Sequence, residues 1–474
     1  MSFKPVILWT DALIYLLVVV IVAFIFYARG KEPLRAPWRL VGQSRMAMAS
    51  LVVLLAYVGV GLLDSLHFQR ALTNDTRGGQ IHYSPEVASV LDTILQPLRD
   101  HVEKTYSAPF ATHLYSKETM EGADGKTIRA YPRLKYGGAY LKNPERDRWP
   151  DIISIIGIAL LQGIGLWLIL TAVVVGILAL RRRAEVGQTI RDVFAGRTSM
   201  PWNIILFTAG ILILLAMLAA DLGVNYHVFG TDKVGQDVLY QSLKSIRTGL
   251  VIGTLTTLVM LPFAILLGIM AGYFRGWVDD VIQYVYTTLN SIPGVLLIAA
   301  AILTLQVFMQ THPDWKIFDT IAYRADIRLL GLCVILGITS WTGLCRLLRG
   351  ETLKLSGVEY IQAASAFGVG HLRIITRHIL PNVMHIVLIS VVLDFSGLVL
   401  AEAVLSYVGV GVDPTMNSWG NMINAARLEM AREPIVWWSL LAAFVLMFVL
   451  VLAANLFSDA VLRGATRRDL RFVG

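Results

Sequence analysis

The chain has 474 residues, of which 56% are hydrophobic and only 16% are charged, and its formal net charge is +8. This composition excludes an ordinary soluble protein, because too few polar side chains are present to cover a globule of this length. The positive charge does not indicate nucleic-acid binding, since the basic residues gather in short loops between apolar segments. The sequence therefore predicts a protein that spans a lipid bilayer.

Nine apolar segments each approach the roughly 20 residues that a helix needs to cross the hydrocarbon core. Their approximate limits are 7–27, 46–63, 152–180, 202–220, 248–271, 292–309, 329–345, 383–407 and 435–457. The first segment is expected to remain in the mature protein, because Lys4 is the only basic residue before it and no small-residue cleavage site follows Tyr27. The sequence thus predicts nine membrane-spanning helices.

Basic residues are concentrated in alternate loops, and this predicts the orientation of the chain. Five basic residues oppose one acid in the loop 28–45, five arginines lie between 181 and 201, and four arginines follow residue 457. By the positive-inside rule these regions are cytoplasmic. The loops with balanced charge are 221–247, 311–328 and 408–434. The N-terminus is therefore expected outside and the C-terminus inside, although two acids outnumber Arg275 in the loop 272–291.

The segments divide the chain into unequal parts. Residues 202–474 contain six spans and form the predicted core, with its transmembrane domain at about 246–457 and a long cytoplasmic loop at 346–381. The preceding residues are an addition to this core. Their predicted divisions are 1–63 with two extra helices, 64–150 as an exported insert, and 151–201 with a third extra helix and a cytoplasmic linker.

The insert is expected to be a small α+β unit. Ser84 and Pro85 suit the N-cap and first position of a helix, and apolar residues from Val87 to Leu98 recur at helical spacing. Pro97 is expected to kink or end that helix. Scattered Tyr, Thr and Ile between His113 and Leu141, around a Gly-Ala-Asp-Gly turn at 122–125, predict a few short strands.

The most informative segment is 357–381, which is polar and partly basic and lies between two apolar spans. A short helix here would present one apolar face with small residues at its centre. The residues of that face are Tyr360, Ala363, Ala364 and Phe367. Gly368 and Gly370 then end the helix, a basic stretch runs from His371 to His378, and the chain turns into the next span at Pro381.

This segment resembles the cytoplasmic coupling loop of ABC-importer permeases, whose pattern is EAA, three residues, Gly, nine residues, then I-x-L-P. Five positions match in register, namely Ala363, Ala364, Gly368, Leu380 and Pro381. Gln362 stands where the pattern has Glu, and His378 where it has Ile. The resemblance implies that an ATPase subunit docks on Tyr360, Gln362, Ala363, Ala364, Phe367, Gly368 and Gly370, with support from Arg346, Arg349 and Arg373.

Three further motifs are similar to those of dipeptide and oligopeptide importer permeases, specifically the second of their two permease types. They are Phe229-Gly230-Thr231-Asp232 with Gly235 and Asp237; Ala271 to Phe274 with Gly276 to Asp279; and Glu402, Leu405 to Tyr407, and Gly409 with Ser418 to Gly420. Gln236 replaces the Arg that is common in the first of these motifs. Gly268 and Gly272 form a G-x-x-x-G pair that permits close helix packing.

The resemblance implies an all-α polytopic membrane protein with the type I ABC importer transmembrane fold. This fold would have a six-helix core, to which the chain adds three N-terminal transmembrane helices and a periplasmic insert. The family implies a heterodimer with a homologous permease in the bacterial inner membrane, two ABC ATPase subunits, and a periplasmic or extracellular substrate-binding protein. The substrate stays open between a dipeptide, an oligopeptide, a nickel chelate and an antimicrobial peptide.

No phosphate-binding G-x-x-x-x-G-K-[ST] sequence is present, so ATP and Mg are expected on partner ATPase chains and no cofactor on this one. No catalytic residues and no metal site are expected. The histidines 371, 378 and 385 lack further ligand types, and neither Cys333 nor Cys345 lies in an exported loop. One alternative is a secondary transporter driven by an ion gradient. Another is a membrane enzyme using Ser107, His113 and Ser116.

Polar residues within the eighth span are candidates for the lining of a pathway, because a carboxylate at the bilayer centre normally faces protein or water. Ser390, Asp394 and Glu402 lie close to one stripe of the expected helix. The structural alternative is that Asp394 bonds to a neighbouring helix and that Glu402 is an acid near the outer end of the span. The sequence leaves both interpretations open.

Overall fold

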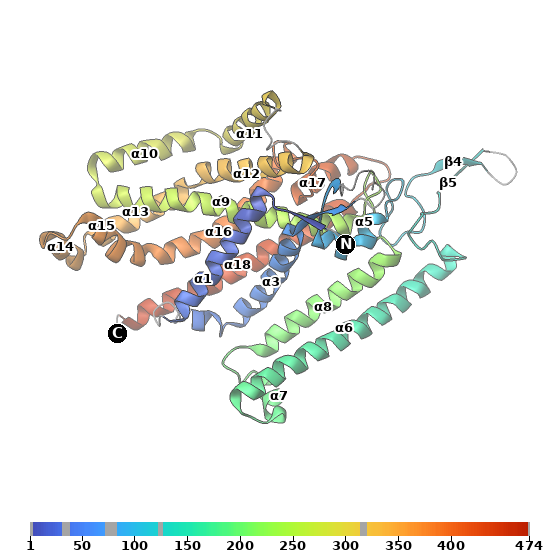
Figure 1. Cartoon of the computed structure of the whole chain (residues 1–474), viewed down its shortest axis with the longest axis horizontal. Coiled ribbons are helices and arrows are strands. Elements are labelled where there is room, and N and C mark those ends of the chain that lie inside the picture. The colour runs from blue at the N-terminus through green and yellow to red at the C-terminus, as the bar shows by residue number, and fades with distance from the viewer. Residues whose placement is uncertain (1–2, 31–37, 72–82, 122–126, 313–319, 473–474) are drawn as a thin grey trace, which may run out of the picture. The chain divides into compact units, whose positions relative to one another are not determined.

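The computed structural model describes residues 3–30, 38–71, 83–121, 127–312 and 320–472 (Figure 1). Within them, nine helical segments are long and apolar enough to cross a membrane, which confirms the all-α polytopic fold. These are α1 (Trp9–Arg29), α3 (Arg45–Ser65), α6 (Pro144–Arg182), α8 (Trp202–Asn225), α9 (Val238–Phe274), α11 (Gly294–Thr311), α12 (Ile321–Ser340) with α13 (Thr342–Ser356), α16 (Leu380–Tyr407), and α18 (Trp438–Phe472). The π-helical turn η2 (Ile375–Ile379) joins α16 to α15 (His371–Ile374).

Several helices extend past the limits predicted from hydropathy. The segment predicted at 248–271 is the middle of α9, which begins at Val238. Hydropathy detects only the apolar part of a helix, whereas the hydrogen-bonded backbone continues into polar ends. The shorter helices are α4 (Val90–Ile94), α5 (Gln96–Asp100), α7 (Val186–Phe194), α10 (Gly276–Ser291), α14 (Glu359–Ala366) and α17 (Trp419–Glu429).

The insert combines short strands and helices, as expected. Strands β1 (Phe3–Val6), β2 (His67–Ala71) and β3 (Tyr83–Ser89) form an antiparallel sheet in that order, and β4 (Glu118–Glu121) pairs with β5 (Thr127–Ala130). The N-terminal strand is therefore part of the same sheet as the insert. The predicted turn at 122–125 lies outside the described residues.

The predicted start of the insert helix is wrong. Ser84 and Pro85 lie in β3, and the helix begins after Ser89, whose side chain accepts a hydrogen bond from the Asp92 backbone while Asp92 bonds back to Ser89. This capping box satisfies two helix N–H groups, and the pairing of residues 83–89 with β2 satisfies the backbone before it. Pro97 lies in the first turn of the next helix, α5, and so follows the break between the two helices.

The described contacts divide the chain into two compact units. Unit 1 comprises Met1–Val6, Lys31–Thr248 and Asn417–Ala460, and unit 2 comprises Ile7–Gly30, Gly249–Met416 and Val461–Gly474. In unit 1, α6 and α8 run side by side (Figure 1), and the Trp167 indole donates a 2.8 Å hydrogen bond to the Leu206 carbonyl. In unit 2, both the backbone N–H and the hydroxyl of Thr10 in α1 bond to Asp326 in α12. The limits predicted from the sequence for the extra helices, the insert and the core stay predictions.

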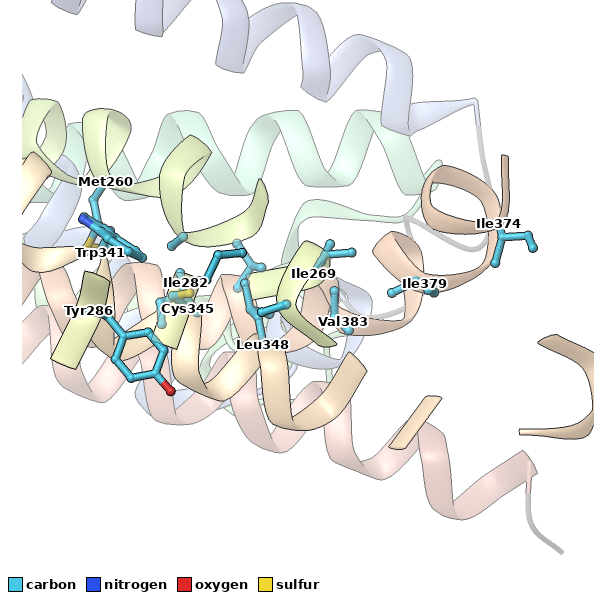
Figure 2. Packing of buried hydrophobic residues seen from close by; sticks show 14 of the residues in the cluster. Met260, Ile269, Ile282, Tyr286, Trp341, Cys345, Leu348, Ile374, Ile379 and Val383 are labelled. Carbon is cyan, nitrogen blue, oxygen red and sulfur yellow. The ribbon is translucent and has the colours of Figure 1, made fainter. Parts of the chain in front are cut away.

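A large cluster of buried hydrophobic side chains lies in unit 2, beneath the segment 357–381 (Figure 2). Its buried side chains come from α9, α10, the segment from Trp341 through α13, α14, α15 and η2, and the start of α16, among them Met260, Ile282, Trp341, Leu348, Ile374, Ile379 and Val383. α9 and α13 approach closely where a Cβ on Gly268 would lie 2.8 Å from the Cys345 carbonyl oxygen, and one on Gly272 would lie 2.7 Å from the Arg349 carbonyl oxygen. The G-x-x-x-G pair thus serves close helix packing, as predicted.

Candidate functional site

The segment singled out in the sequence forms a helix, a glycine turn and a second helix. At the end of α14, Phe367 N–H bonds to the Ala363 carbonyl and Val369 N–H to the Ala364 carbonyl, both near 3 Å. Gly368 has a φ of +74°, a left-handed conformation that side-chain-bearing residues rarely adopt. Gly370 has an ordinary negative φ and directly precedes α15. The turn therefore depends on Gly368 in particular.

The sequence predicted one apolar face for α14, but the structure divides the apolar residues of this helix between a buried side and an exposed side. Ile361 is only 2% exposed and belongs to the unit 2 cluster, against which Ala364 also packs. Tyr360 and Phe367 are 45% and 88% exposed, and Ala363 is exposed as well. The sequence analysis overlooked Ile361, although its spacing of three residues from Ala364 marks the inward stripe. The outward surface, here called the α14 face, consists of Tyr360, Ala363 and Phe367.

Polar contacts support this helix from within the chain. Gln362, which is exposed, donates a 3.2 Å hydrogen bond to the Gly357 carbonyl. The Tyr360 hydroxyl accepts a 3.0 Å hydrogen bond from Asn382 at the start of α16. Gln362 therefore contacts the turn before α14 within its own chain.

Two of the three predicted basic residues are engaged by α10. Arg349 donates to both carboxylate oxygens of Asp279, with the Nη2–Oδ2 distance 2.7 Å, and this pair lowers the pKa of Asp279. The Arg346 guanidinium lies 5.3 Å from the centre of the Tyr286 ring. Arg373 is exposed on α15. The Arg349 contact also explains the acidic loop 272–291, because one of its two acids is neutralised within the chain.

Two further bonds join the segment to the end of α9. The Tyr273 hydroxyl lies 2.9 Å from His371 Nδ1, and Arg275 donates a 2.8 Å hydrogen bond to the Ser356 hydroxyl. Together with the Asp279 pair, these contacts fix both ends of the α13–α15 segment on α9 and α10. A displacement of α14 would therefore be carried into α9 and α16 by packed side chains.

The polar residues of α16 differ in their surroundings. Ser390 is 8% exposed, Asp394 is half-buried, and Glu402 is 2% exposed. The Ser406 hydroxyl donates a 2.7 Å hydrogen bond to Glu402 at the end of the helix. For Asp394, the described residues supply neither a hydrogen bond nor an ion pair. The structure thus gives Glu402 a polar contact within α16.

A second site lies in unit 1, where the Phe229–Asp237 motif binds the insert. His227 Nδ1 is 2.8 Å from Asp237, and its Nε2 is 3.6 Å from Glu103 of the insert, with all three side chains at most 3% exposed. Burial alone would lower the pKa of His227, but the two carboxylates outweigh it and raise the pKa to about 9. The Glu103 carboxylate also accepts backbone hydrogen bonds from Lys135 and Tyr136.

The glycines of this motif allow the two backbones to meet. A Cβ on Gly235, whose φ is +80°, would lie 1.8 Å from the Glu103 carbonyl oxygen, and one on Gly230 would lie 2.3 Å from the Ser107 carbonyl oxygen. Thr231 exchanges backbone and hydroxyl hydrogen bonds with Ser107. The sequence analysis gave this motif only as a mark of family resemblance. In the structure it forms the surface on which the insert packs.

Two other groups of contacts fix the insert. The Lys244 ammonium in α9 lies 2.7 Å from Asp64 and 2.9 Å from Asp92. The Tyr106 hydroxyl donates a 3.1 Å hydrogen bond to Glu429, and the Trp438 indole holds the motif itself through a 2.9 Å bond to the Thr231 carbonyl. The sequence analysis missed all of these pairs, since the partners are far apart in the chain.

The residues considered for other chemistry are not brought together. Ser107 is buried against Thr231, His113 bonds to Thr112, and Ser116 is exposed. Among the described residues, no group of three His, Cys, Asp or Glu side chains could hold a metal ion. Cys333 and Cys345 are buried and free.

Comparison with known proteins identifies similarity across the second half of the chain. Residues 264–467 match a family described as the binding-protein-dependent transport system inner membrane component. The oligopeptide transport system permease OppC of Haemophilus influenzae is 30% identical over 234 residues, which cover 49% of this chain and 68% of that protein. The glutathione transport system permease GsiD of Pectobacterium atrosepticum is 30% identical over 237 residues, covering 50% and 70%. The dipeptide transport system permease DppC of Bacillus subtilis is 26% identical over 235 residues, covering 50% and 67%.

Proposed function

Because the chain belongs to the binding-protein-dependent transport permeases of peptide ABC importers, we propose that it pairs with a homologous permease and is driven by ATP hydrolysis on partner subunits. The two permeases would form the pathway for peptides or peptide-like solutes. ATP and Mg would be bound by the two ATPase chains, and this chain would bind no cofactor. It is a multi-pass protein of the inner membrane.

The observation that carries the proposal is the α14 face, which is apolar, exposed and rigidly supported. Phe367 is 88% exposed at the tip of a short helix whose opposite side is anchored by Ile361. A large apolar side chain in this position has no role in the packing of its own chain. It is suited to a pocket on a partner, where such residues commonly supply most of the binding energy.

The supporting contacts suggest how the motion would be transmitted. ATP binding and hydrolysis would displace the docked helix as a rigid body. Because α14 is packed through Ile361, and the segment is bonded through His371 and Arg349, the displacement would reach α9, α10 and α16 together. We infer that Arg346 and Arg349 act inside this chain by holding α13 on α10, whereas Arg373 is exposed on α15.

The pathway and the orientation are further parts of the proposal. Ser390 and Asp394 are proposed to line the pathway, and Glu402 to line it or to brace the end of α16 through Ser406. The N-terminus would lie outside with the substrate-binding protein, and the C-terminus would lie in the cytoplasm. The pairing of β1 with β2 supports a common side for the N-terminus and the insert. Family membership leaves the secondary transporter and the membrane enzyme without a supporting observation.

The experiment uses Phe367→Asp and Ala363→Asp, since both positions are exposed and the substitutions leave the unit 2 cluster intact. Each should release the ATPase subunits during purification from detergent and abolish uptake, while the partner permease is still recovered. Val234→Asp is the control, because Val234 is 61% exposed in unit 1. Normal ATPase recovery and uptake with Phe367→Asp and Ala363→Asp would refute the docking role of the α14 face.

A further inference from the structure

Unit 2 contains an apolar groove that the proposed function does not use. Its volume is about 660 Å³, within the range of roughly 300–1,000 Å³ that is usual for small-molecule sites. α9 lines one wall with residues that include Pro262 and Leu266, and the α15–η2–α16 segment lines the other with residues that include Leu372 and Ile375. Leu266 and Leu372 are 61% and 75% exposed. The groove is therefore accessible from outside the unit.

One end of the groove is polar. Its lining side chains are apolar except for His371 and Thr376, and His371 bonds to Tyr273 at 2.9 Å. His371 also begins a basic stretch, since the sequence contains no Asp or Glu from Tyr360 to Leu393. A ligand that fits here must be apolar along the groove and compatible with positive charge at this end.

Two arginines supply that charge. Arg373 and Arg377 are exposed, and each directly follows a lining residue, Leu372 or Thr376. Neither arginine has an ion pair within the residues that the structure describes, whereas Arg349 is neutralised by Asp279. Guanidinium groups bind phosphate oxygens well, and basic clusters between membrane helices recognise anionic lipid headgroups.

We propose that this groove binds one anionic phospholipid. An acyl chain would fill the space between α9 and the α15–η2–α16 segment, and the phosphate would lie beside Arg373 and Arg377. A transmembrane helix of another protein would match the apolar walls but would leave these two charges facing apolar surface, which is costly. A phospholipid matches both parts of the site. Because His371 and Arg373 belong to the segment that follows α14, the lipid would stabilise the coupling loop from its membrane side.

The test measures lipid binding directly, with the full chain in nanodiscs and photoactivatable phosphatidylglycerol or phosphatidylcholine as probes. Phosphatidylglycerol should label peptides of α9 and α16 more strongly than phosphatidylcholine. Arg373→Gln and Arg377→Gln should each weaken phosphatidylglycerol labelling by about fivefold at low salt. Replacement of both arginines by Lys should preserve the preference. Leu266→Trp, which fills the groove, should reduce labelling by both lipids.

Matched controls separate the site from general membrane contact. Arg29→Gln changes an exposed arginine at the end of α1, and Leu388→Trp enlarges an exposed residue of α16 that does not line the groove. Neither should change labelling. Equal labelling by the two lipids, or equal losses with the control variants, would overturn the proposal. A photoreactive residue at position 266 that captures the partner permease instead of lipid would assign the groove to a protein interface.

Discussion

Nδ1 of His227 lies 2.8 Å from a carboxylate oxygen of Asp237, ten residues later in the chain, and both side chains are almost fully buried. Glu103 of the insert lies on the other side of the ring, and His101 is a further titratable neighbour, whose pKa is lowered by burial and by the charge of His227. One imidazolium thus joins the Phe229–Asp237 motif to the insert. Two buried carboxylates would face each other without it, which makes the contact sensitive to the charge of His227.

The stability of unit 1 should fall at alkaline pH because of this histidine. The pKa of His227 is raised from 6.5 to about 9 in the folded chain, so the protonated ring stabilises the fold fully below pH 6.5. This contribution, roughly 3 kcal/mol, is lost as the pH rises through about 9. Thermal unfolding of the purified chain, followed at pH 7 and pH 10, should show the decrease.

His227→Gln should be less stable at pH 7 and should lose this part of the pH dependence. His113→Gln is the matched control, because His113 lies in the insert and bonds only to the adjacent Thr112 among the described residues. An unchanged difference between pH 7 and pH 10 in His227→Gln would contradict the assignment of the proton to this ring.

The sequence predicted the spanning helices and the glycine turn because both depend on local features. Nine apolar segments are visible in any window of suitable length, and Gly368 lies where a helix must end. The insert contacts could not be predicted in this way. Glu103 and His227 are separated by more than a hundred residues, and no spacing rule connects them. Gly230 and Gly235 were the available signal, since two glycines in a short motif suggest a close backbone approach.

The errors at the sequence level arose where tertiary packing overrides a local pattern. Ser84 and Pro85 resemble a helix start, but residues 83–89 pair with β2 and the capping box of Ser89 sets the boundary. In α14, the sequence predicted one apolar face for docking into a partner, made of Tyr360, Ala363, Ala364 and Phe367. Ala364 instead packs beside Ile361 on the unit 2 cluster, because the side chains beneath the helix determine which side of it is covered.

The pair formed by Arg349 and Asp279 should couple α13 to α10 energetically. Arg349→Gln leaves the largely buried Asp279 carboxylate without its cation, and Asp279→Asn leaves the guanidinium without an anion. Each single change should cost about 1.5–3 kcal/mol, and the double variant should cost less than the sum of both. Thermal unfolding of the four proteins gives the coupling energy. Strictly additive losses would show that the pair does not act as a unit.

Substitution of Asp394 should affect uptake, whereas substitution of Glu402 should affect folding. Asp394 is half-buried, and the described residues supply no partner for it, so Asp394→Asn should lower uptake while ATPase association and yield stay normal. Glu402 is buried and bonded to Ser406, so Glu402→Leu should reduce the amount of folded protein. Glu402→Gln, which keeps an acceptor, is the matched control. Normal uptake with Asp394→Asn would remove this residue from the pathway.

The orientation of the chain can be tested with single cysteines at two exposed positions. Thr127 lies in the hairpin of the insert and Ser365 in α14, and both side chains are accessible in the described structure. With Cys333 and Cys345 replaced by Ala, an impermeant thiol reagent applied to intact cells should label Thr127→Cys and not Ser365→Cys. Cell lysis should expose Ser365→Cys to the same reagent. The reasons are the positive-inside rule for the loops at 28–45 and 181–201, and the sheet that joins the N-terminal strand to the insert. Labelling of both positions in intact cells would contradict the nine-span topology, and labelling of Ser365→Cys alone would reverse it.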